Sequence, residues 1–327
     1  MASFRQRNKK WQARVTCKGF PDEVKTFDSK VDAQRWAREI ESSMDVGTYV
    51  NKSLADELKL FDVLERYKLE VSPTKRGAKR EAEGIAFMQR RKMALFSMSK
   101  LSPSVIAAYR DERLRTVSPG TIIRELCILS GVINHARKEW SLPISNPCEM
   151  VRKPATPRGR DRLLSTDEEI RLLDELKPTG RRSPWMSPLV SLALETAMRR
   201  GELLSLTWVN IDLDRQTAFL PMTKNGSVRT VPLSKNAIAI LRSIPIHAND
   251  RVFQLSEMGM EAAFRKACKR ASISNLHFHD LRHTATSRLA EKLPNVIELA
   301  AVTGHQTIQM LKRYYHPQAE ALAKKLG

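Results

Sequence analysis

The 327-residue chain is predicted to be mainly α-helical with small β-sheets, an α+β fold. Three observations predict this class. Long stretches after residue 50 repeat apolar residues every three or four positions, which places them on one face of a helix. Short stretches near the N-terminus and around residues 216–233 alternate like strands. Serine followed three positions later by an acidic residue marks several helix starts.

Residues 1–50 are predicted to form a small module of their own. Residues 11–15 alternate like a strand, and a turn at Lys18-Gly19 leads to a second strand near residues 24–27. Ser29 with Asp32 resembles a capping box that opens a helix. The first twenty residues carry six Lys and Arg and no acid. This basic surface fits either a ribbon that enters a DNA major groove or a solvated face.

Residues 51–145 are predicted to form a helical bundle. Ser53 and Asp56 cap a first helix, whose core stripe is Leu54, Leu58, Phe61 and Leu64. Further helical patterns cover residues 78–93, 104–115 and 121–140. Basic residues lie between these stripes, at Lys75, Arg76, Lys79, Arg80, Arg90, Arg91 and Lys92. They fit contacts to a DNA backbone, and ordinary helix-surface charge explains them equally well.

Residues 146–164 are rich in Pro and Arg, lack periodicity and are predicted to be a basic linker. A second large domain then covers residues 165–327. Ser165 and Glu168 form a capping box at its start. Strand patterns lie on either side of Asn225-Gly226, a strong hairpin signal, and Ser234 begins another helix.

The excess of basic residues indicates which class of partner the chain binds. There are 56 Lys and Arg against 36 Asp and Glu, a formal net charge of +20. Such an excess favours a polyanion, with nucleic acid as the first candidate. A basic soluble protein and a protein lying on an anionic membrane are the alternatives. No apolar run approaches the roughly 18 residues of a membrane span, and the N-terminal charges precede no apolar signal core.

Residues 277–317 concentrate the chemically useful side chains. His279 and Arg282 are three positions apart, so they share one face of a helix. Tyr314 follows His305 by nine residues and is itself followed by Tyr315. Cation, imidazole and phenol are the groups needed to hold a phosphodiester and attack it covalently. The segment therefore predicts a site for phosphodiester chemistry.

Several motifs resemble those of the tyrosine recombinases, the phage integrase family. Thr196 to Leu204 resembles the first arginine box of the family, and His279-Asp280-Leu281-Arg282-His283 resembles its His-x-x-Arg box. Residues 299–305 and Arg313-Tyr314-x-His316 resemble the histidine and nucleophile boxes. Lys224 lies where the family carries a catalytic lysine on a β-hairpin. The sequence departs from the family at Ala197-Met198, where Gly-Leu is common.

The resemblance covers residues 165–317 in order and spacing, and more weakly the rest of the chain. It implies a catalytic domain at 165–327 and a helical core-binding domain at 51–145. It also implies an arm-type DNA-binding module at 1–50, built from a three-stranded sheet plus a helix. The catalytic residues that it implies are Arg199, Lys224, His279, Arg282, His305 and Tyr314, with Glu202 in support.

Each of these residue types suits its implied role. Arg199 and Arg282 can each donate paired N–H bonds to the non-bridging phosphate oxygens. Tyr314 is the nucleophile and forms a phosphotyrosine ester. His279 and His305 orient the phosphate and move protons near neutral pH. The resemblance implies that Lys224 is the acid for the leaving 5′ oxygen, and Glu202 holds the Arg199 guanidinium or its neighbours.

Taken singly, these residues have simpler interpretations. Arg199 and Glu202 alone fit an ion pair on a helix surface, worth a few tenths of a kcal/mol. Lys224 alone fits a solvated turn residue, and His305 after a glycine fits a helix cap. A metal site at His279 and His283 lacks the Glu of the zinc-protease motif, since residue 280 is Asp. The joint order of the motifs favours catalysis, and we expect neither metal nor other cofactor.

The sequence thus predicts a site-specific DNA recombinase, an integrase that cleaves and rejoins DNA through a 3′-phosphotyrosine intermediate and integrates or excises a phage or mobile genomic element. The alternatives are a type IB topoisomerase-like enzyme and a non-catalytic DNA-binding regulator. The expected partners are double-stranded DNA at attachment sites and three further copies in a homo-tetramer that exchanges the segment 320–326. An excisionase and a DNA-bending protein are candidate accessory partners. We expect the bacterial cytoplasm, in association with the nucleoid, and no membrane partner.

Overall fold

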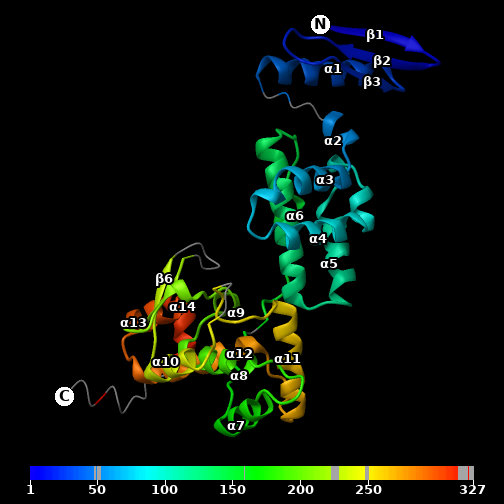
Figure 1. The fold of residues 1–327 in the computed structure, drawn as a ribbon. Coiled ribbons are helices and arrows are strands. Elements are labelled where there is room, and N and C mark those ends of the chain that lie inside the picture. Colours follow the sequence, from blue (N-terminus) through cyan, green and yellow to red (C-terminus); the bar gives the residue numbers. More distant parts are fainter. Residues whose placement is uncertain are drawn as a thin grey trace. The chain divides into compact units, whose positions relative to one another are not determined.

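The computed structural model describes residues 1–47, 49, 53–157, 159–221, 228–246, 250–315 and 323. The chain divides into two compact units, Met1–Arg158 and Gly159–Gly327, both drawn in Figure 1. Helices dominate and the two sheets are small and antiparallel, so the predicted α+β class is confirmed. Several predicted features lie outside the described residues: Lys224, the Asn225-Gly226 turn, His316 and, except for residue 323, the segment 320–326.

The N-terminal module is a three-stranded sheet with one helix packed on it. Its strands follow one another in space as in sequence, and its elements are β1 (Ala2–Arg7), β2 (Lys10–Val15), β3 (Glu23–Phe27) and α1 (Lys30–Asp45). Ala13 and Val15 of β2 are fully buried, and α1 packs against this strand. Ser29 is the N-cap of α1 as predicted, but its hydroxyl accepts from Val31 N at 3.2 Å and not from Asp32 N, so the cap differs from the predicted capping box.

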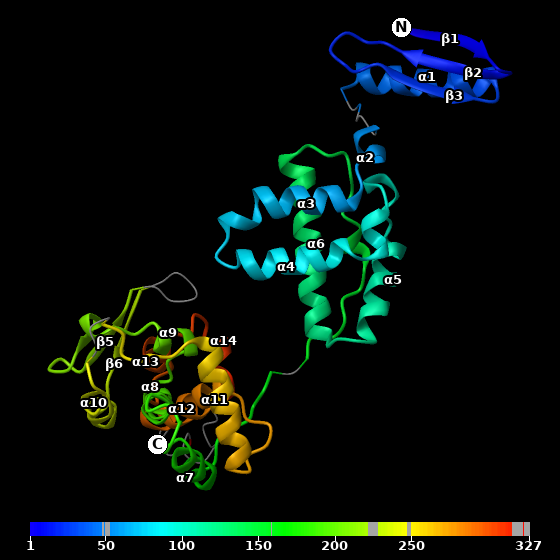
Figure 2. The same ribbon diagram turned by 45° about the vertical axis from the view of Figure 1, so that its right-hand side comes forward.

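The rest of this unit is a helical bundle. Its helices are α2 (Ser53–Glu57), α3 (Leu60–Glu70), α4 (Ala78–Gln89), α5 (Pro103–Leu114) and α6 (Pro119–Glu139), with 3-10 turns at Ser72–Thr74, Lys92–Leu95, Met98–Lys100 and Pro147–Met150. Helices α3 and α4 lie side by side and cross α6, while α5 runs along it (Figure 2). The predicted stripe on α6 is buried, with Leu129 and Ile133 fully inside.

The helix predicted from Ser53 through Leu64 is two helices. The chain leaves α2 at Glu57, and α3 begins after Lys59, whose backbone N–H donates to Asp62 Oδ2 at 3.0 Å. Leu64 is buried as expected, but Phe61 is 42% exposed, so the prediction that Phe61 belongs to the core stripe was wrong. Asp62 accepts from the backbone N–H that precedes α3 and so begins a separate helix at Leu60, whose apolar face does not continue that of α2.

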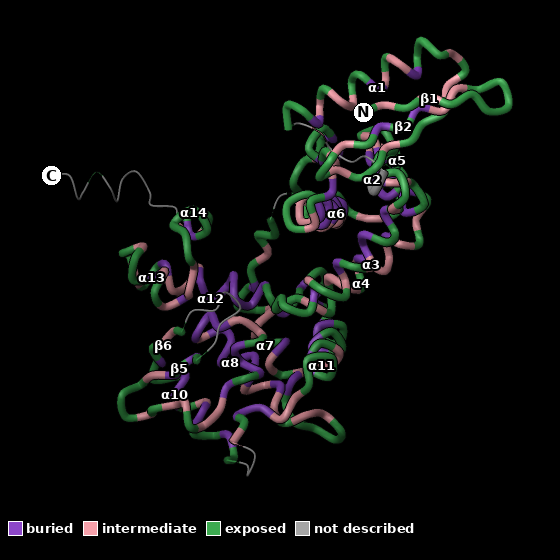
Figure 3. The backbone as a smooth tube through the Cα atoms, turned by 90° about the horizontal axis from the view of Figure 1, so that it is seen from above, coloured by how far each residue is buried: buried purple, intermediate pink, exposed green. Residues whose placement is uncertain are grey.

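The C-terminal unit holds the second sheet and helices α7 to α14. Its elements are α7 (Thr166–Glu175), α8 (Met186–Thr196), α9 (Arg200–Leu204), β4 (Ile211–Asp212), β5 (Thr217–Leu220), β6 (Arg229–Pro232), α10 (Lys235–Arg242), α11 (Glu257–Arg270), α12 (Phe278–Lys292), α13 (Val296–Thr303) and α14 (Ile308–Leu311), with 3-10 turns at Trp208–Asn210 and Lys312–Tyr314. Figure 3 shows buried backbone concentrated along α8 and α12, which pack against each other. These two helices form the platform on which the site is built.

Local signals at the start of this unit behave as predicted. Ser165 and Glu168 form a reciprocal capping box at α7, and the Ser234 hydroxyl accepts from Ala237 N at 3.0 Å to cap α10.

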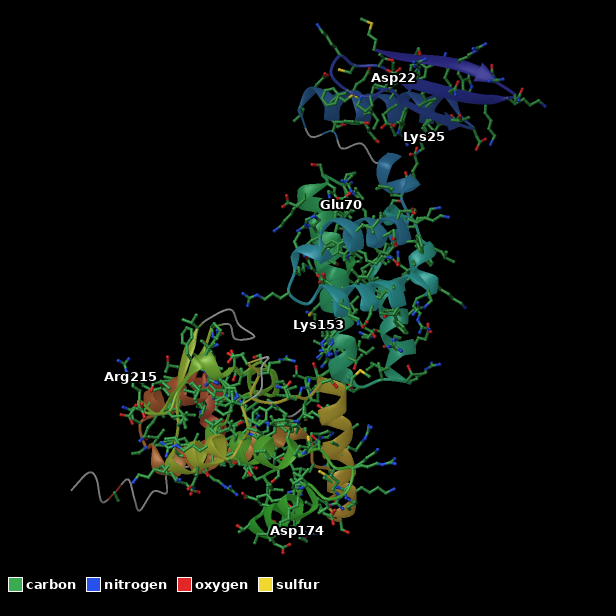
Figure 4. The ribbon with its side chains drawn as sticks, in the orientation of Figure 1. Asp22, Lys25, Glu70, Lys153, Asp174 and Arg215 are labelled. Carbon is green, nitrogen blue, oxygen red and sulfur yellow. The ribbon has the colours of Figure 1, made fainter. Side chains whose placement is uncertain are left out.

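Arg215 of the turn between β4 and β5 projects from the unit into solvent (Figure 4). Among the described residues, none of the helices combines the length and the apolar character that a bilayer crossing requires.

The predicted linker, 146–164, is ordered at both ends against the unit beside it. Cys148 and Val151 are buried in the core of the bundle. At the other end, the Leu164 backbone N–H donates to Thr284 Oγ1 of α12 at 2.8 Å. The extended part of the linker is therefore shorter than its composition suggests.

Candidate functional site

The candidate site surrounds the C-terminal end of α13. This helix is followed by Gly304, whose φ of 68° is left-handed and ends the helix. Backbone carbonyls at a helix C-terminus lack intrahelical donors and lie at the negative end of the helix dipole. Three consecutive carbonyls here each accept a hydrogen bond from a different arginine: Val302 from Arg229, Thr303 from Arg282 at 2.6 Å, and Gly304 from Arg199 at 2.9 Å. One helix end therefore gathers three guanidinium groups from α12, β6 and the start of α9.

Arg282 is the most deeply buried of the predicted phosphate-binding residues, with 4% of its surface exposed. Its Nη1 donates to the carbonyl of Ala197, in the turn between α8 and α9, and its Nη2 donates to Thr303. Ala197 itself has a φ of 51°. A guanidinium carries five N–H donors, so these two carbonyls fix its plane and leave other donors for an anion.

Arg199 is fixed by an acid in the next turn. Its backbone N–H donates to Glu202 Oε2 at 2.9 Å, and its Nη1 donates to Glu202 Oε1 at 2.7 Å. Arg229 of β6 donates to the same carboxylate from Nη2 at 2.6 Å. The side chains of Glu202 and Arg229 are only 4% and 8% exposed. Glu202 thus binds two arginines at once and orients both, and its single negative charge offsets only one of the two positive charges.

His305 follows the helix cap directly. Its Nδ1 lies 2.7 Å from the Thr303 hydroxyl, and its Nε2 lies 3.5 Å from Nη2 of Arg282. Its ring centroid is 6.0 Å from that of Tyr314. The imidazole therefore lies between the guanidinium of Arg282, a predicted phosphate-binding group, and the predicted nucleophile.

Tyr314 lies in the 3-10 turn after α14 and faces α12. Its hydroxyl is hydrogen-bonded to Nδ1 of His283, and the two rings stack with 5.8 Å between centroids. His279, one turn earlier on α12, packs edge-on against His283 at 5.1 Å. In the part of the chain that the structure describes, no group of three His, Cys, Asp or Glu side chains is arranged to hold a metal ion.

Five of the residues predicted from sequence therefore meet in one cluster: Arg199, Glu202, Arg282, His305 and Tyr314. His279 is exposed at its edge, against the ring of His283. Lys224 belongs to the segment 222–227, which the structure does not describe. The cluster offers guanidinium groups, imidazoles and a phenol around one point, which is the set needed for attack on a phosphodiester.

Comparison with known proteins agrees with this chemistry. The model of the phage integrase family matches residues 162–321. A shufflon-specific DNA recombinase from Escherichia coli is 41% identical over 279 residues, which are 83% of this chain and 72% of that protein. A putative integrase/recombinase from Haemophilus influenzae is 34% identical, with 100% of this chain and 91% of that protein covered. This chain is a tyrosine recombinase of the phage integrase family. It is a site-specific recombinase and hence an enzyme.

Solved structures of recombinases share its fold. A lambda integrase dimer bound to a COC′ core site has a TM-score of 0.67 and 19% identity, and covers 95% of this chain and 93% of its own. The Tn1549 transposon integrase, residues 82–397, in complex with circular intermediate DNA has a TM-score of 0.65 and 15% identity, covering 83% of this chain and 100% of its own. At such identities the likeness is one of fold.

The electrostatics of the candidate site favour a bound anion. Burial, followed by the charge of Arg199, lowers the pKa of Arg282 to about 9. Burial, followed by the charge of Arg282, lowers the pKa of His305 to about 3. Burial raises the pKa of Glu202, but the nearby Arg229 and Arg199 outweigh this and keep it below its usual value. Positive charge is therefore in excess at the site, and an anion there is stabilised.

Sequence reasoning missed Arg229. The residue lies in the second strand of the predicted hairpin, where an arginine ordinarily faces solvent. Its partner Glu202 is 27 residues earlier, and its carbonyl partner Val302 is 73 residues later. No local pattern signals such contacts, although the alternation in β6 places Arg229 and the buried Val231 on one face.

A second missed residue is Arg160, at the end of the predicted linker. Its guanidinium donates to both oxygens of Asp280, at 3.0 and 2.7 Å, and to the backbone and side chain of Asn275. Asp280 is fully buried and also accepts from His277 N at 2.8 Å, at the start of α12. Burial raises the pKa of Asp280, and the bonds from Arg160 more than offset this and lower it. Arg160 thus fixes the first turn of the helix that carries His279 and Arg282.

The N-terminal sheet has a separate basic face. Helix α1 packs on the side of Ala13 and Val15, so the alternate residues of β1 and β2 lie on the opposite side. Cross-strand register groups them in pairs: Ser3 with Arg14, Arg5 with Gln12, and Arg7 with Lys10. The four basic residues of this set are exposed. Arg14 also forms an ion pair with Asp22 of the following loop.

Some of the basic residues predicted on the bundle have partners within it. Lys75 bonds the hydroxyl of Tyr67 and pairs with Glu81 at 2.9 Å. Arg91 stacks over the ring of Phe87 at 4.1 Å. For these two positions, the simpler interpretation as structural charge has direct support.

Proposed function

We propose that this recombinase cleaves and rejoins double-stranded DNA at attachment sites through a 3′-phosphotyrosine intermediate, and so integrates or excises a phage or other mobile genomic element. Arg199 and Arg282 hold the scissile phosphate, and Tyr314 attacks it. The observation that carries the proposal is the cluster around the α13 C-terminus, where backbone carbonyls and the Glu202 carboxylate hold both guanidinium planes. Preorganised donors of this kind lower the cost of charge that develops in the transition state.

Other residues complete the reaction in this proposal. His305 and His279 orient the phosphate and exchange protons with it. Lys224 protonates the leaving 5′ oxygen. This last role rests on the position of Lys224 in the sequence, between strands β5 and β6. Strand β6 also carries Arg229, which belongs to the arginine cluster. No metal or other cofactor takes part.

The remaining domains bring DNA to the site. We infer an arm-type DNA-binding module at 1–50, a core-binding domain at 51–145 and a catalytic domain at 165–327. The exposed Arg5, Arg7 and Lys10 on the open sheet face support the first of these. The lambda integrase has been solved as a tetramer bound to a Holliday junction, and we propose that this chain likewise acts as a homo-tetramer on DNA. An excisionase and a DNA-bending protein fit as accessory partners, and the bacterial nucleoid as the place of action.

The decisive experiment is to trap the covalent complex of the purified chain on DNA that flanks its gene. Denaturation after the reaction should leave DNA attached to the protein, and sequencing the freed ends should return one defined position. Covalent capture at random positions, together with relaxation of plasmids that lack this site, would contradict site-specific recombination. The tetramer is tested by mass photometry of the protein mixed with two DNA duplexes that carry the site. A protein that stays monomeric on this DNA would contradict the proposal.

A further inference from the structure

We propose that His283 is a catalytic residue that accepts the proton of the Tyr314 hydroxyl as this oxygen attacks phosphorus. This inference deepens the proposed function and rests on it. His283 follows Arg282 directly in sequence, and the six catalytic residues implied by the motif comparison leave it without a role. The structure brings its imidazole to the nucleophile itself.

The contact is specific in geometry. Nδ1 of His283 is hydrogen-bonded to the Tyr314 hydroxyl, and the ring planes lie 28° apart in a stacked arrangement. A stacked ring whose nitrogen meets the hydroxyl fixes both the position and the direction of the phenol. His283 is 9% exposed and is held on α12 between Arg282 and the buried Thr284. The base is therefore as rigid as the helix that presents the phosphate-binding arginine.

The surroundings keep this imidazole unprotonated and ready to accept. Burial, then the neighbouring His279 and Arg313, lower the pKa of His283 to about 4. A neutral imidazole whose Nδ1 faces an O–H group accepts that hydrogen bond, with the other ring nitrogen carrying the proton. A phosphodiester bound at Arg282 adds negative charge beside the ring, which raises its proton affinity at the moment when the proton must move.

The other imidazoles are less suited to this step. His305 is bonded through Nδ1 to Thr303 and lies beside Arg282 through Nε2, with its ring centroid 6.0 Å from the tyrosine ring. His279 is exposed and packs edge-on against the ring of His283. Both are placed to contact the phosphate or the ring of His283, whereas His283 holds the reacting oxygen.

The proposed step balances as follows. Oη of Tyr314 forms a bond to phosphorus, and its proton moves to Nδ1 of His283. The bond between phosphorus and the 5′ oxygen breaks, and that oxygen takes a proton from the acid of the site, proposed above as Lys224. On rejoining, the 5′ hydroxyl gives its proton to the now neutral Lys224 as its oxygen bonds to phosphorus. The bond from phosphorus to Oη of Tyr314 breaks, and His283 returns its proton to the departing phenolate.

The first test needs no DNA. In ¹⁵N-resolved NMR of the full-length free protein, we expect His283 to be neutral, with Nδ1 unprotonated and Nε2 protonated. Tyr314→Phe should shift the Nδ1 resonance because it removes the O–H donor, while Tyr315→Phe should leave it in place. An unchanged Nδ1 resonance in Tyr314→Phe overturns the proposed contact, whatever the enzyme does with DNA.

The second test measures the chemical step on a nicked suicide duplex made from the site mapped by covalent trapping. His283→Leu removes the acceptor, and His283→Asn keeps an acceptor near Nδ1 that takes up no proton. Loss of a general base costs about 10²–10⁴-fold in rate. We expect both variants to lose single-turnover cleavage by this factor while gel-shift affinity for the duplex is retained. Cleavage by His283→Asn at the wild-type rate overturns the proton-transfer role.

A sulfur leaving group separates the base from the acid. A 5′-bridging phosphorothiolate departs without a proton, so it replaces the acid and leaves the need for a base intact. We expect this substrate to restore cleavage by Lys224→Ala and to leave His283→Asn slow; rescue of His283→Asn overturns the proposal. If the wild-type chain captures no DNA at all, the proposed function fails, and the NMR experiment alone decides whether His283 binds Tyr314.

Discussion

A methyl group added at Gly304 probes the arginine cluster directly. At a φ of 68° an L side chain costs about 1–2 kcal/mol. The new Cβ would also lie 2.9 Å from Cδ, Nε and Nη1 of Arg229, so that buried side chain must move away from Val302 and Glu202. Breaking a buried ion pair costs about 3–5 kcal/mol. We expect Gly304→Ala to lower the free energy of unfolding by about 4–7 kcal/mol, the sum of the two costs, if Arg229 is displaced fully, and by less if it moves only part of the way.

Gly180→Ala is the matched control. Gly180 has a φ of 60°, and a Cβ there meets no atom within 4 Å, so this variant carries only the backbone strain of about 1–2 kcal/mol. Scanning calorimetry of the full chain measures both, because 1 kcal/mol shifts the Tm of a domain of this size by about 2–4 °C. Equal shifts for the two variants would refute the argument, since the Arg229 contact would then contribute nothing. DNA cleavage should fall in Gly304→Ala alone, because the Gly304 carbonyl holds Arg199.

Three further predictions concern the same unit. Glu202→Gln should lower the free energy of unfolding by about 3–5 kcal/mol, because Arg229 loses its buried counter-charge; the exposed Glu257→Gln should cost less than about 1 kcal/mol in the same urea titration. Tyr314→Phe should abolish covalent capture of a nicked substrate and Tyr315→Phe should retain it, and the reverse pattern would assign the nucleophile to Tyr315. In the folded chain the pKa values of His283 and His305, about 4 and about 3, lie below the ordinary histidine value of 6.5. The unfolded state therefore takes up protons first, and stability should fall as the pH drops from 6.5 toward 4; a urea midpoint that stays constant over this window contradicts that linkage.

Local patterns were sufficient to predict many elements of the fold. The apolar stripe of α6 and the capping box of α7 depend on residues three or four positions apart, so sequence alone contains the whole signal. The division at residues 58–59 was missed because Asp62 competes with the continuation of a helix that the apolar spacing favours. Strand β1 was also absent from the residue-based pattern, although the family resemblance implied a third strand. Its pairing with β2 supplies the stability that its own polar sequence lacks.

The residues of the site also fall into two groups, those that a sequence pattern reveals and those that only the folded chain brings together. Arg199, Arg282, His305 and Tyr314 were predicted because the order of the motifs is itself a sequence pattern. Arg229 and the bond from His283 to Tyr314 were not predicted, since partners 27 and 31 residues away meet only after the helices pack. Burial also decides protonation, and the sequence carries no direct measure of it.

The anchoring of the arginines on backbone carbonyls has a consequence for sequence change. A carbonyl belongs to every amino acid, so replacing the side chain of Val302 leaves in place the oxygen that Arg229 binds. The same holds for Ala197, whose oxygen binds Arg282. Neighbouring positions can therefore drift over generations, or be redesigned, while the guanidinium groups keep their alignment. The exception is Gly304, where any added side chain meets Arg229, so at that position the backbone oxygen cannot be separated from the residue type.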